Sequence, residues 1–191
     1  MPPDPSAEPT DRALDLRVRP ETPGDVGAVR AVVRAAFGGE QVPDLLDDLR
    51  RSVAWLDLSL IAELESEVVG HVSLSRAWVD DPASVVEVLV LSPLSVRPDV
   101  QKQGVGTALV RAALAAADRR TEPVVFLEGD PRYYSRLGFV EAGPLGFTRP
   151  SPRIPERAFQ AWLTPARRPG LSGALVYPDV FWRHDAVGLR P

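Results

Sequence analysis

The sequence has no cysteine, and Lys102 is the only lysine among its 191 residues. Without cysteine, the chain can form neither a disulfide nor a thiolate metal site. It also lacks a charged leader followed by an apolar stretch, and no apolar run is long enough to cross a bilayer. The net charge of −4 disfavours nucleic acid as the main partner. We therefore expect a soluble, cytoplasmic protein without a membrane or nucleic-acid partner.

Length and composition predict a single folded unit. A chain of this length with 45% hydrophobic residues can form one well-packed hydrophobic core and is too short to form two. Residues 1–12 are rich in proline, polar and free of periodicity, which is typical of a disordered tail. The expected organisation is a tail over residues 1–12 and one domain over residues 13–191.

Hydrophobic periodicity and turn residues predict a mixed α/β domain. Thr22-Pro-Gly-Asp25 supplies an N-cap, a proline at the first helical position and an acid in the first turn, so a helix begins there. Buried strands at 85–96 and 123–128 flank a helix and form a β-α-β unit. The other predicted strands lie at 14–19, 58–62, 68–74, 159–163 and 175–177, and Leu45, Leu46, Leu49 and Val53 mark a further helix.

The most informative segment joins strand 85–96 to the helix that follows it. Pro93 cannot donate to a sheet ladder, so the strand should bend near residues 92–94 and separate there from a neighbour, which opens a slot. Gly104 and Gly106 then leave the backbone N–H groups at the start of the helix unshielded. Such N–H groups, together with the helix dipole, bind anions. The sequence therefore predicts a pyrophosphate cradle beside the mouth of the slot.

Other interpretations of the glycine turn were compared with this one. A P-loop requires a lysine before Ser or Thr, whereas Thr107 follows Gly106 directly. A dinucleotide-binding fingerprint requires a third glycine, and Leu109 stands in its place. The remaining alternative is an ordinary strand-to-helix loop whose glycines only permit the turn.

Two further motifs accompany the turn: Leu94-Ser-Val96 before it and Tyr133-Tyr-Ser-Arg-Leu-Gly-Phe139 after the next strand. Together with Gln101-x-x-Gly104-x-Gly106, they resemble the GCN5-related N-acetyltransferase (GNAT) family. The run at 129–139 looks closest to its YhbS-like subgroup. The resemblance implies the family fold, a central mixed sheet that is splayed at the cofactor slot and flanked by helices. It also implies N-acetyl transfer with acetyl-CoA as the cosubstrate.

The resemblance places the cofactor along the slot and over the glycine turn. The pantetheine arm is expected to pair with Leu94 and Val96, and the pyrophosphate is expected on the N–H groups at the helix start. A strand amide near Leu94 would donate to the oxygen that becomes negative during attack. Lys102 either reaches a phosphate or is a solvated loop side chain. The implied cofactor-binding residues are Leu94, Ser95, Val96, Gln101, Lys102, Gln103, Gly104, Val105, Gly106 and Thr107.

The family pattern also implies an acid and a base. Tyr134, the second aromatic of its motif, is expected to protonate the departing CoA thiolate, whereas Tyr133 packs against the cofactor arm or the core. Glu87 is the candidate base, because the family often places a carboxylate on this strand. The alternative for Glu87 is an outward-facing acid on a half-buried strand.

Two other polar residues have mainly structural interpretations. Asp130 either attracts a cationic amine or caps the helix that carries the two tyrosines, and we favour the cap. His71 lies in an apolar strand and is interpreted as a core histidine. With His184 as the only other histidine, no metal cluster is predicted.

The acceptor is expected to be an amine of a small molecule or a peptide. In the family, the C-terminal strands and the loop between the first two helices form the walls of the acceptor pocket. The resemblance of this sequence to the family is weakest in those segments. The alternative from another class is a module that binds or senses acyl-CoA without turnover. The resemblance leaves a homodimer open.

Overall fold

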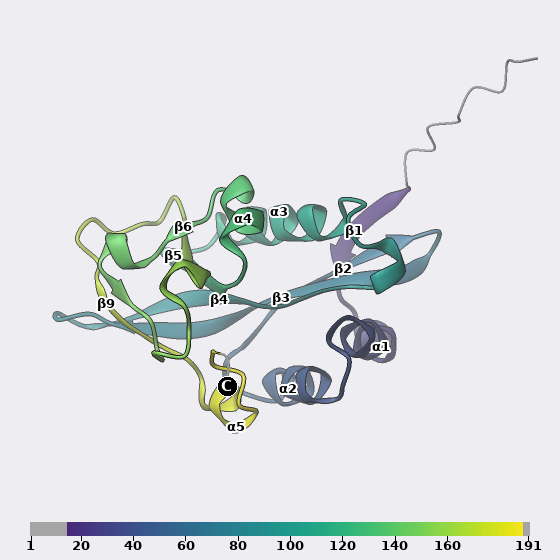
Figure 1. Ribbon diagram of the computed structural model, residues 1–191, viewed down its shortest axis with the longest axis horizontal. Helices are drawn as coiled ribbons and strands as arrows, with labels where there is room; N and C mark the ends of the chain where they lie inside the picture. The colour runs from purple at the N-terminus through teal and green to yellow at the C-terminus, as the bar shows by residue number, and fades with distance from the viewer. Residues whose placement is uncertain (1–14, 189–191) are drawn as a thin grey trace, which may run out of the picture.

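A nine-stranded mixed sheet forms the middle layer of the computed structural model, which describes residues 15–188 (Figure 1). The strands are β1 (Leu16–Pro20), β2 (Trp55–Leu64), β3 (Glu67–Asp80), β4 (Val85–Val96), β5 (Val124–Glu128), β6 (Val140–Glu141), β7 (Phe147–Thr148), β8 (Phe159–Leu163) and β9 (Gly173–Val176). Their order is β1-β2-β3-β4-β5-β8-β6, while β9 pairs with β3 and β7 pairs with β9. The β4–β5 and β7–β9 pairs are parallel, and the other pairs are antiparallel.

Helices cover both faces of the sheet. They are α1 (Val26–Phe37), α2 (Gln41–Arg50), α3 (Val105–Ala117), α4 (Pro131–Tyr134) and α5 (Asp179–Arg183). Figure 1 shows α1, α2 and α5 below the sheet and α3 and α4 above it. The predicted mixed sheet with flanking helices is therefore confirmed.

The alternation of side chains along β4 assigns each of them to one of two cores. Val88 and Val90 pack with residues of α2 and α5, whereas Leu89 and Leu91 pack with residues of α3. Successive side chains of a strand point to opposite faces, so the parity of a β4 position determines which layer it joins.

The first helical segment begins where the sequence predicts. Thr22 is the N-cap residue of a short 3-10 helix, Pro23–Asp25, which continues directly into α1. The Thr22 backbone N–H donates to the Asp25 carboxylate at 2.8 Å, and the Thr22 side chain completes a capping box. At the other end, Gly38 adopts a φ of 75°, a left-handed conformation that glycine tolerates without strain.

The sheet is splayed between β4 and β5. Only two residues of β4, Leu89 and Val90, pair with β5, although β4 continues to Val96. On its other edge β4 stays paired with β3 up to the Gly70–Val96 position, with one irregularity between Val72 and Leu74. The separation predicted near Pro93 is therefore confirmed, and it leaves one edge of residues 91–96 without a strand partner in the described sheet.

The central hairpin is longer than the sequence predicts. The strands expected at 58–62 and 68–74 extend to β2 and β3, and β3 continues far enough for Trp78 to pair with Val176 of β9. Residues 75–80, which extend β3, alternate between buried and partly exposed positions, and the sequence expectation ended before them at Leu74. The two-residue strands β6 and β7 carry no local signal.

Two sequence expectations concern the ends of the chain and membranes. The tail predicted for residues 1–12 lies outside the described residues, and the strand expected at 14–19 is observed as β1. Within residues 15–188, no helix combines the length and the hydropathy that a membrane span requires.

Candidate functional site

A groove of about 280 Å³ lies over the N-terminus of α3. It is lined by Leu94 and Val96 of β4, by Gln101 and Lys102 of the connecting loop, by Gly104, Gly106 and Thr107 at the helix start, and by Tyr133 of α4. Seven of the ten residues predicted to bind the cofactor therefore share one groove. The side chains of Ser95 and Val105 are buried, and Gln103 donates to the Asp99 carbonyl at 3.3 Å.

The start of α3 presents unpaired N–H groups to this groove. The Ala108 N–H donates to the Gly104 carbonyl at 3.0 Å and closes the first turn, so the three preceding N–H groups point out of the helix. Gly104 has a φ of 89°, which favours glycine. At Gly106, an added Cβ would lie 2.8 Å from the Tyr133 hydroxyl oxygen and 3.5 Å from Val96 Cγ2. Glycine at this position keeps the floor of the groove open.

The free edge of β4 also carries backbone polar groups. The Arg97 N–H donates to the Val69 carbonyl of β3 at 2.8 Å. Because successive backbone groups of a strand alternate in direction, Leu94 and Val96 direct theirs to the other side, into the splay. The Val96 carbonyl accepts from Gln101 Nε2 at 3.0 Å, so Gln101 fixes the loop to the strand end. The Leu94 amide faces the slot.

Tyr133 and Tyr134 have different surroundings although they are adjacent in α4. Their rings meet edge to face with centroids 4.9 Å apart. Tyr133 lines the groove, whereas Tyr134 packs on the backbone of Gly129 and against Phe139, with ring centroids 5.7 Å apart. Burial raises the pKa of the Tyr134 phenol, so it stays protonated near neutral pH and can donate a hydrogen bond.

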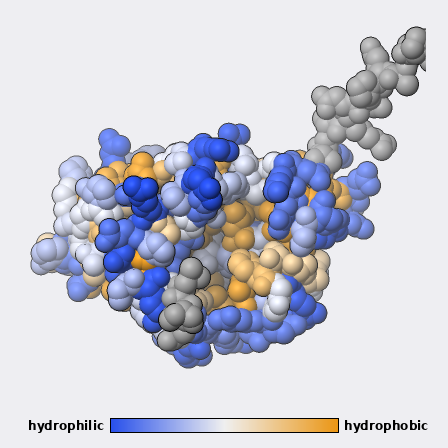
Figure 2. All heavy atoms as spheres, viewed as in Figure 1, coloured by the Kyte–Doolittle hydropathy of each residue, from blue (hydrophilic) through white to orange (hydrophobic). Residues whose placement is uncertain are grey.

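A cavity of about 690 Å³ opens beside the splay. Its walls come from the last residue of α1 and the first turns of α2, from residues 90–93 of β4, from the end of β5 and the residues up to 131, from the segment 155–158 before β8, and from α5 with the segments on either side of it. Its lining on β4 ends at Pro93, and that of the groove begins at Leu94. Figure 2 shows hydrophobic residues around a hollow at the centre of this face, framed by hydrophilic ones. Groove and cavity therefore adjoin at the slot.

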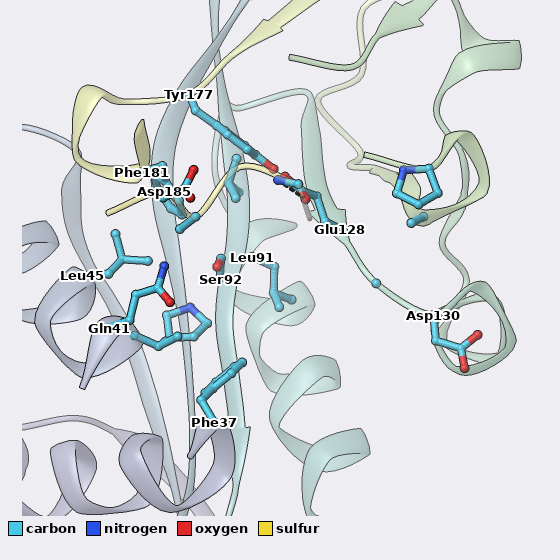
Figure 3. A pocket seen from close by; sticks show the side chains of 18 of the residues that line it. Phe37, Gln41, Leu45, Leu91, Ser92, Glu128, Asp130, Tyr177, Phe181 and Asp185 are labelled. Carbon is cyan, nitrogen blue, oxygen red and sulfur yellow. Dashed lines mark hydrogen bonds between the residues drawn. The ribbon is translucent and has the colours of Figure 1, made fainter. Parts of the chain in front are cut away.

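Glu128, the last residue of β5, reaches this cavity. Its Oε2 accepts a hydrogen bond from the Gly188 N–H at 3.1 Å, and Figure 3 shows the Tyr177 side chain directed toward it. Its Oε1 is buried and has no hydrogen-bond donor among the described residues. Burial raises the pKa of Glu128, against the opposing effects of the Tyr177 hydroxyl and the Gly188 N–H. The sequence analysis missed Glu128, for which the only local signal is an acid that ends a buried strand.

The structure does not bring Glu87 to the cavity. Glu87 precedes residues 90–93, the stretch of β4 that lines the cavity, and neither cavity nor groove includes it. It forms an ion pair with Arg76 at 2.8 Å. This is the arrangement that its alternative interpretation expects, so we do not retain Glu87 as the base.

Asp130 and His71 have structural partners. Asp130 caps α4 by accepting from the Arg132 N–H at 2.9 Å, and its side chain points away from Glu128 in Figure 3. His71 is fully buried, with its Nε2 2.8 Å from Ser59 Oγ and 3.4 Å from Glu21 Oε2. Among residues 15–188, no three His, Asp or Glu side chains are grouped so that they could hold a metal ion.

Comparisons with known proteins agree with this architecture. A family model described as an acetyltransferase (GNAT) domain matches residues 56–141. The Escherichia coli K12 protein named uncharacterized N-acetyltransferase YjhQ is 34% identical over 141 residues, which cover 73% of this chain and 77% of that protein. YhbS of the same strain, also named an uncharacterized N-acetyltransferase, is 31% identical over 125 residues, or 65% of this chain and 73% of YhbS.

Two solved structures are similar over most of the chain. Escherichia coli YhbS in complex with CoA has a TM-score of 0.81 and 29% identity, covering 92% of this chain and 97% of that one. A GNAT family acetyltransferase from Brucella melitensis in complex with acetyl-CoA has a TM-score of 0.69 and 29% identity, covering 87% and 97%.

Proposed function

Because the chain belongs to the GNAT family of acetyltransferases, we propose that it transfers the acetyl group of acetyl-CoA directly to an amine. The observation that carries this proposal is the meeting of two spaces at the splay. A groove with unpaired N–H groups adjoins a largely apolar cavity across residues 93 and 94. Donor and acceptor can therefore approach the same point of the sheet from separate sides.

The groove residues fit the cofactor. The pyrophosphate is proposed on the N–H groups of residues 102–107, at the positive end of the α3 dipole, with Lys102 beside it as the nearest cation of the loop. The pantetheine arm is proposed along the free edge of β4, where its amides pair with Leu94 and Val96. This places the thioester carbonyl at the slot, where the Leu94 N–H would donate to the developing oxyanion.

Tyr134 is proposed as the general acid. When the C–S bond of the tetrahedral intermediate breaks, CoA leaves as a thiolate, and a protonated phenol within hydrogen-bond reach can donate its proton. Burial keeps Tyr134 in this protonated form. Tyr133 is assigned to the cofactor groove that it lines.

The proposal is tested by measuring release of the CoA thiol from acetyl-CoA with the full chain and a panel of primary amines, amino acids and peptides. We expect acetylated product and free CoA in equal amounts with at least one amine class, confirmed by mass spectrometry. Tight binding of acetyl-CoA without release for any acceptor would instead support a module that senses acyl-CoA. Absence of binding would refute the cradle itself.

A further inference from the structure

The cavity buries one carboxylate oxygen that is left without a donor. Glu128 Oε1 has no solvent-exposed surface and accepts no hydrogen bond from the described residues. An unpaired buried carboxylate oxygen is costly, because the protein does not replace the hydrogen bonds that water gave it. Because Glu128 lines the cavity, a turn of its carboxyl group would let an N–H or O–H donor of a ligand there reach Oε1 and remove this cost.

The other acids of the cavity are already engaged. Asp130 caps α4 and pairs with Arg132 at 3.1 Å. Asp185 lies 3.7 Å from the guanidinium of Arg153. Glu128 is thus the carboxylate of this cavity with an acceptor position to spare.

The charged and titratable groups that face Glu128 come from three segments. Tyr177, just after β9, directs its hydroxyl to the carboxylate, and the Gly188 N–H donates to Oε2. Arg153, in the loop after β7, acts on Glu128 through its charge and donates to the Val187 carbonyl at 2.7 Å. These groups hold the carboxylate at the end of β5, in the wall of the cavity.

Much of the remaining wall is apolar. Figure 3 shows Leu45 and Phe181 on one side and Phe37 lower in the view, and Pro93 completes the wall at the slot. A pocket with apolar walls and few polar groups binds a ligand through its apolar body and orients it through those groups. Here the orienting group is an anion, so it selects a cationic donor.

We propose that Glu128 receives the ammonium group of the acceptor and removes its proton, and that the acceptor is a primary amine attached to an apolar body. This inference rests on the proposed acetyl transfer. It assigns to Glu128 the role of base that the sequence analysis gives to Glu87.

The proton balance of the step is complete. The ammonium N–H proton passes to Glu128, and the freed lone pair attacks the thioester carbonyl carbon to form the C–N bond. Breaking of the C–S bond releases CoA as a thiolate, which takes a proton from Tyr134, and the amide nitrogen gives its second proton to solvent. Glu128 and Tyr134 then return to their starting states by exchange with solvent, with one net proton released.

The surroundings of Glu128 suit this transfer. Burial raises the pKa of its carboxyl above the ordinary value, which brings it closer to that of an alkylammonium and makes the carboxylate a stronger base. The Tyr177 hydroxyl and the Gly188 N–H act against this rise in the pKa.

The first experiment measures recognition without turnover. Calorimetry compares phenethylamine with phenethyl alcohol, which carries the same apolar body without the charge. We expect the wild-type chain to bind the ammonium at least about tenfold more tightly than the alcohol. Glu128→Gln should lose this preference. The matched control, Glu65→Gln, changes an exposed acid in the β2–β3 turn and should retain it.

The second experiment measures proton removal. With phenethylamine and acetyl-CoA, kcat/KM of Glu128→Gln should fall by about 10²–10⁴-fold near neutral pH. Its residual rate should rise about tenfold per pH unit as the free amine forms in solution. With aniline, which has no ammonium proton to remove near neutral pH, the variant should lose far less.

A second variant keeps the carboxylate and changes only its neighbour. Tyr177→Phe removes the hydroxyl that lowers the pKa of Glu128, so the acid limb of the kcat/KM profile should move to higher pH. This result remains informative if Glu128→Gln folds poorly.

Three outcomes would overturn the inference: equal binding of ammonium and alcohol, parallel pH profiles for Glu128→Gln and wild type, or an unmoved profile in Tyr177→Phe. A wild-type chain that binds the ammonium through Glu128 but releases no CoA would refute acetyl transfer and the proton-transfer step. That outcome would support the recognition of ammonium alone.

Discussion

Gly106→Val gives the sharpest test of the groove over α3. An added Cβ at this position lies 2.8 Å from the Tyr133 hydroxyl oxygen and 3.5 Å from Val96 Cγ2, so the valine methyl groups project into the groove in front of the helix N–H groups. Within a helix, valine is intrinsically no worse than glycine, and Tyr133 can move the far end of its side chain. The unliganded variant should therefore fold with a nearly unchanged melting temperature.

The expected loss of the ligand effect can be worked out. Acetyl-CoA at about a hundred times its Kd stabilises a native state that alone binds it by about 2.7 kcal/mol. For a chain of this size, 1 kcal/mol corresponds to about 2–4 °C, so the wild-type melting temperature should rise by about 5–11 °C. A hundredfold weaker affinity leaves about 0.4 kcal/mol, or about 1 °C.

Differential scanning calorimetry with and without acetyl-CoA measures both quantities. Gly27→Val is the matched control, because Gly27 is also the second residue of its helix and an added Cβ there meets nothing within 4 Å. Tyr133→Ala separates displacement of the tyrosine from shielding of the backbone. A full ligand shift in Gly106→Val would show that the pyrophosphate binds elsewhere.

Three further predictions follow from the same residues. Tyr134→Phe should lower turnover by about 10²–10⁴-fold in a thiol-release assay, with acetyl-CoA binding nearly intact. Tyr133→Phe should turn over at close to the wild-type rate. The opposite result for the two variants would identify Tyr133 as the acid. Burial lowers the pKa of His71 below its unfolded value near 6.5, so its stabilising contribution is present above that pH and is lost as the pH falls below it. The free energy of unfolding from urea titrations should therefore change little between pH 7.5 and 6.5 and fall by up to about 1.4 kcal/mol per pH unit below that, and an equally steep fall in His71→Gln would contradict this assignment. Deletion of residues 1–12 should change neither turnover nor midpoint, and a large loss of either would show that they contribute to the fold or the site.

Local signals allowed much of the groove to be predicted. Pro93 cannot donate to a ladder, and β4 and β5 part beside it. The glycines at 104 and 106 mark the exposed start of α3, and the structure brings them into one groove with Leu94 and Val96. Each of these features depends on residues that are close together in the chain, so the local sequence is enough to predict it.

The cavity could not be predicted in the same way. Glu128 meets Tyr177 and Gly188, which lie about fifty and sixty residues further along the chain, and no local pattern encodes such a contact. Glu87 shows the complementary error, because an acid on a half-buried strand can face either layer. Only the folded structure shows that the cavity is lined by residues 90–93 of β4 and that Glu87 lies outside it, paired with Arg76.

The sequence by itself therefore determined most of the helices and longer strands, their order, the slot and the glycine turn at the start of α3, because backbone conformation and helix starts are decided within a few residues. The tertiary structure alone decided which face of the sheet each strand side chain joins, how far β3 extends to meet β9, and which carboxylate lines the cavity. Those features depend on packing between layers formed by distant parts of the chain. The hydrophobic burial that stabilises them arises only when these layers are in contact.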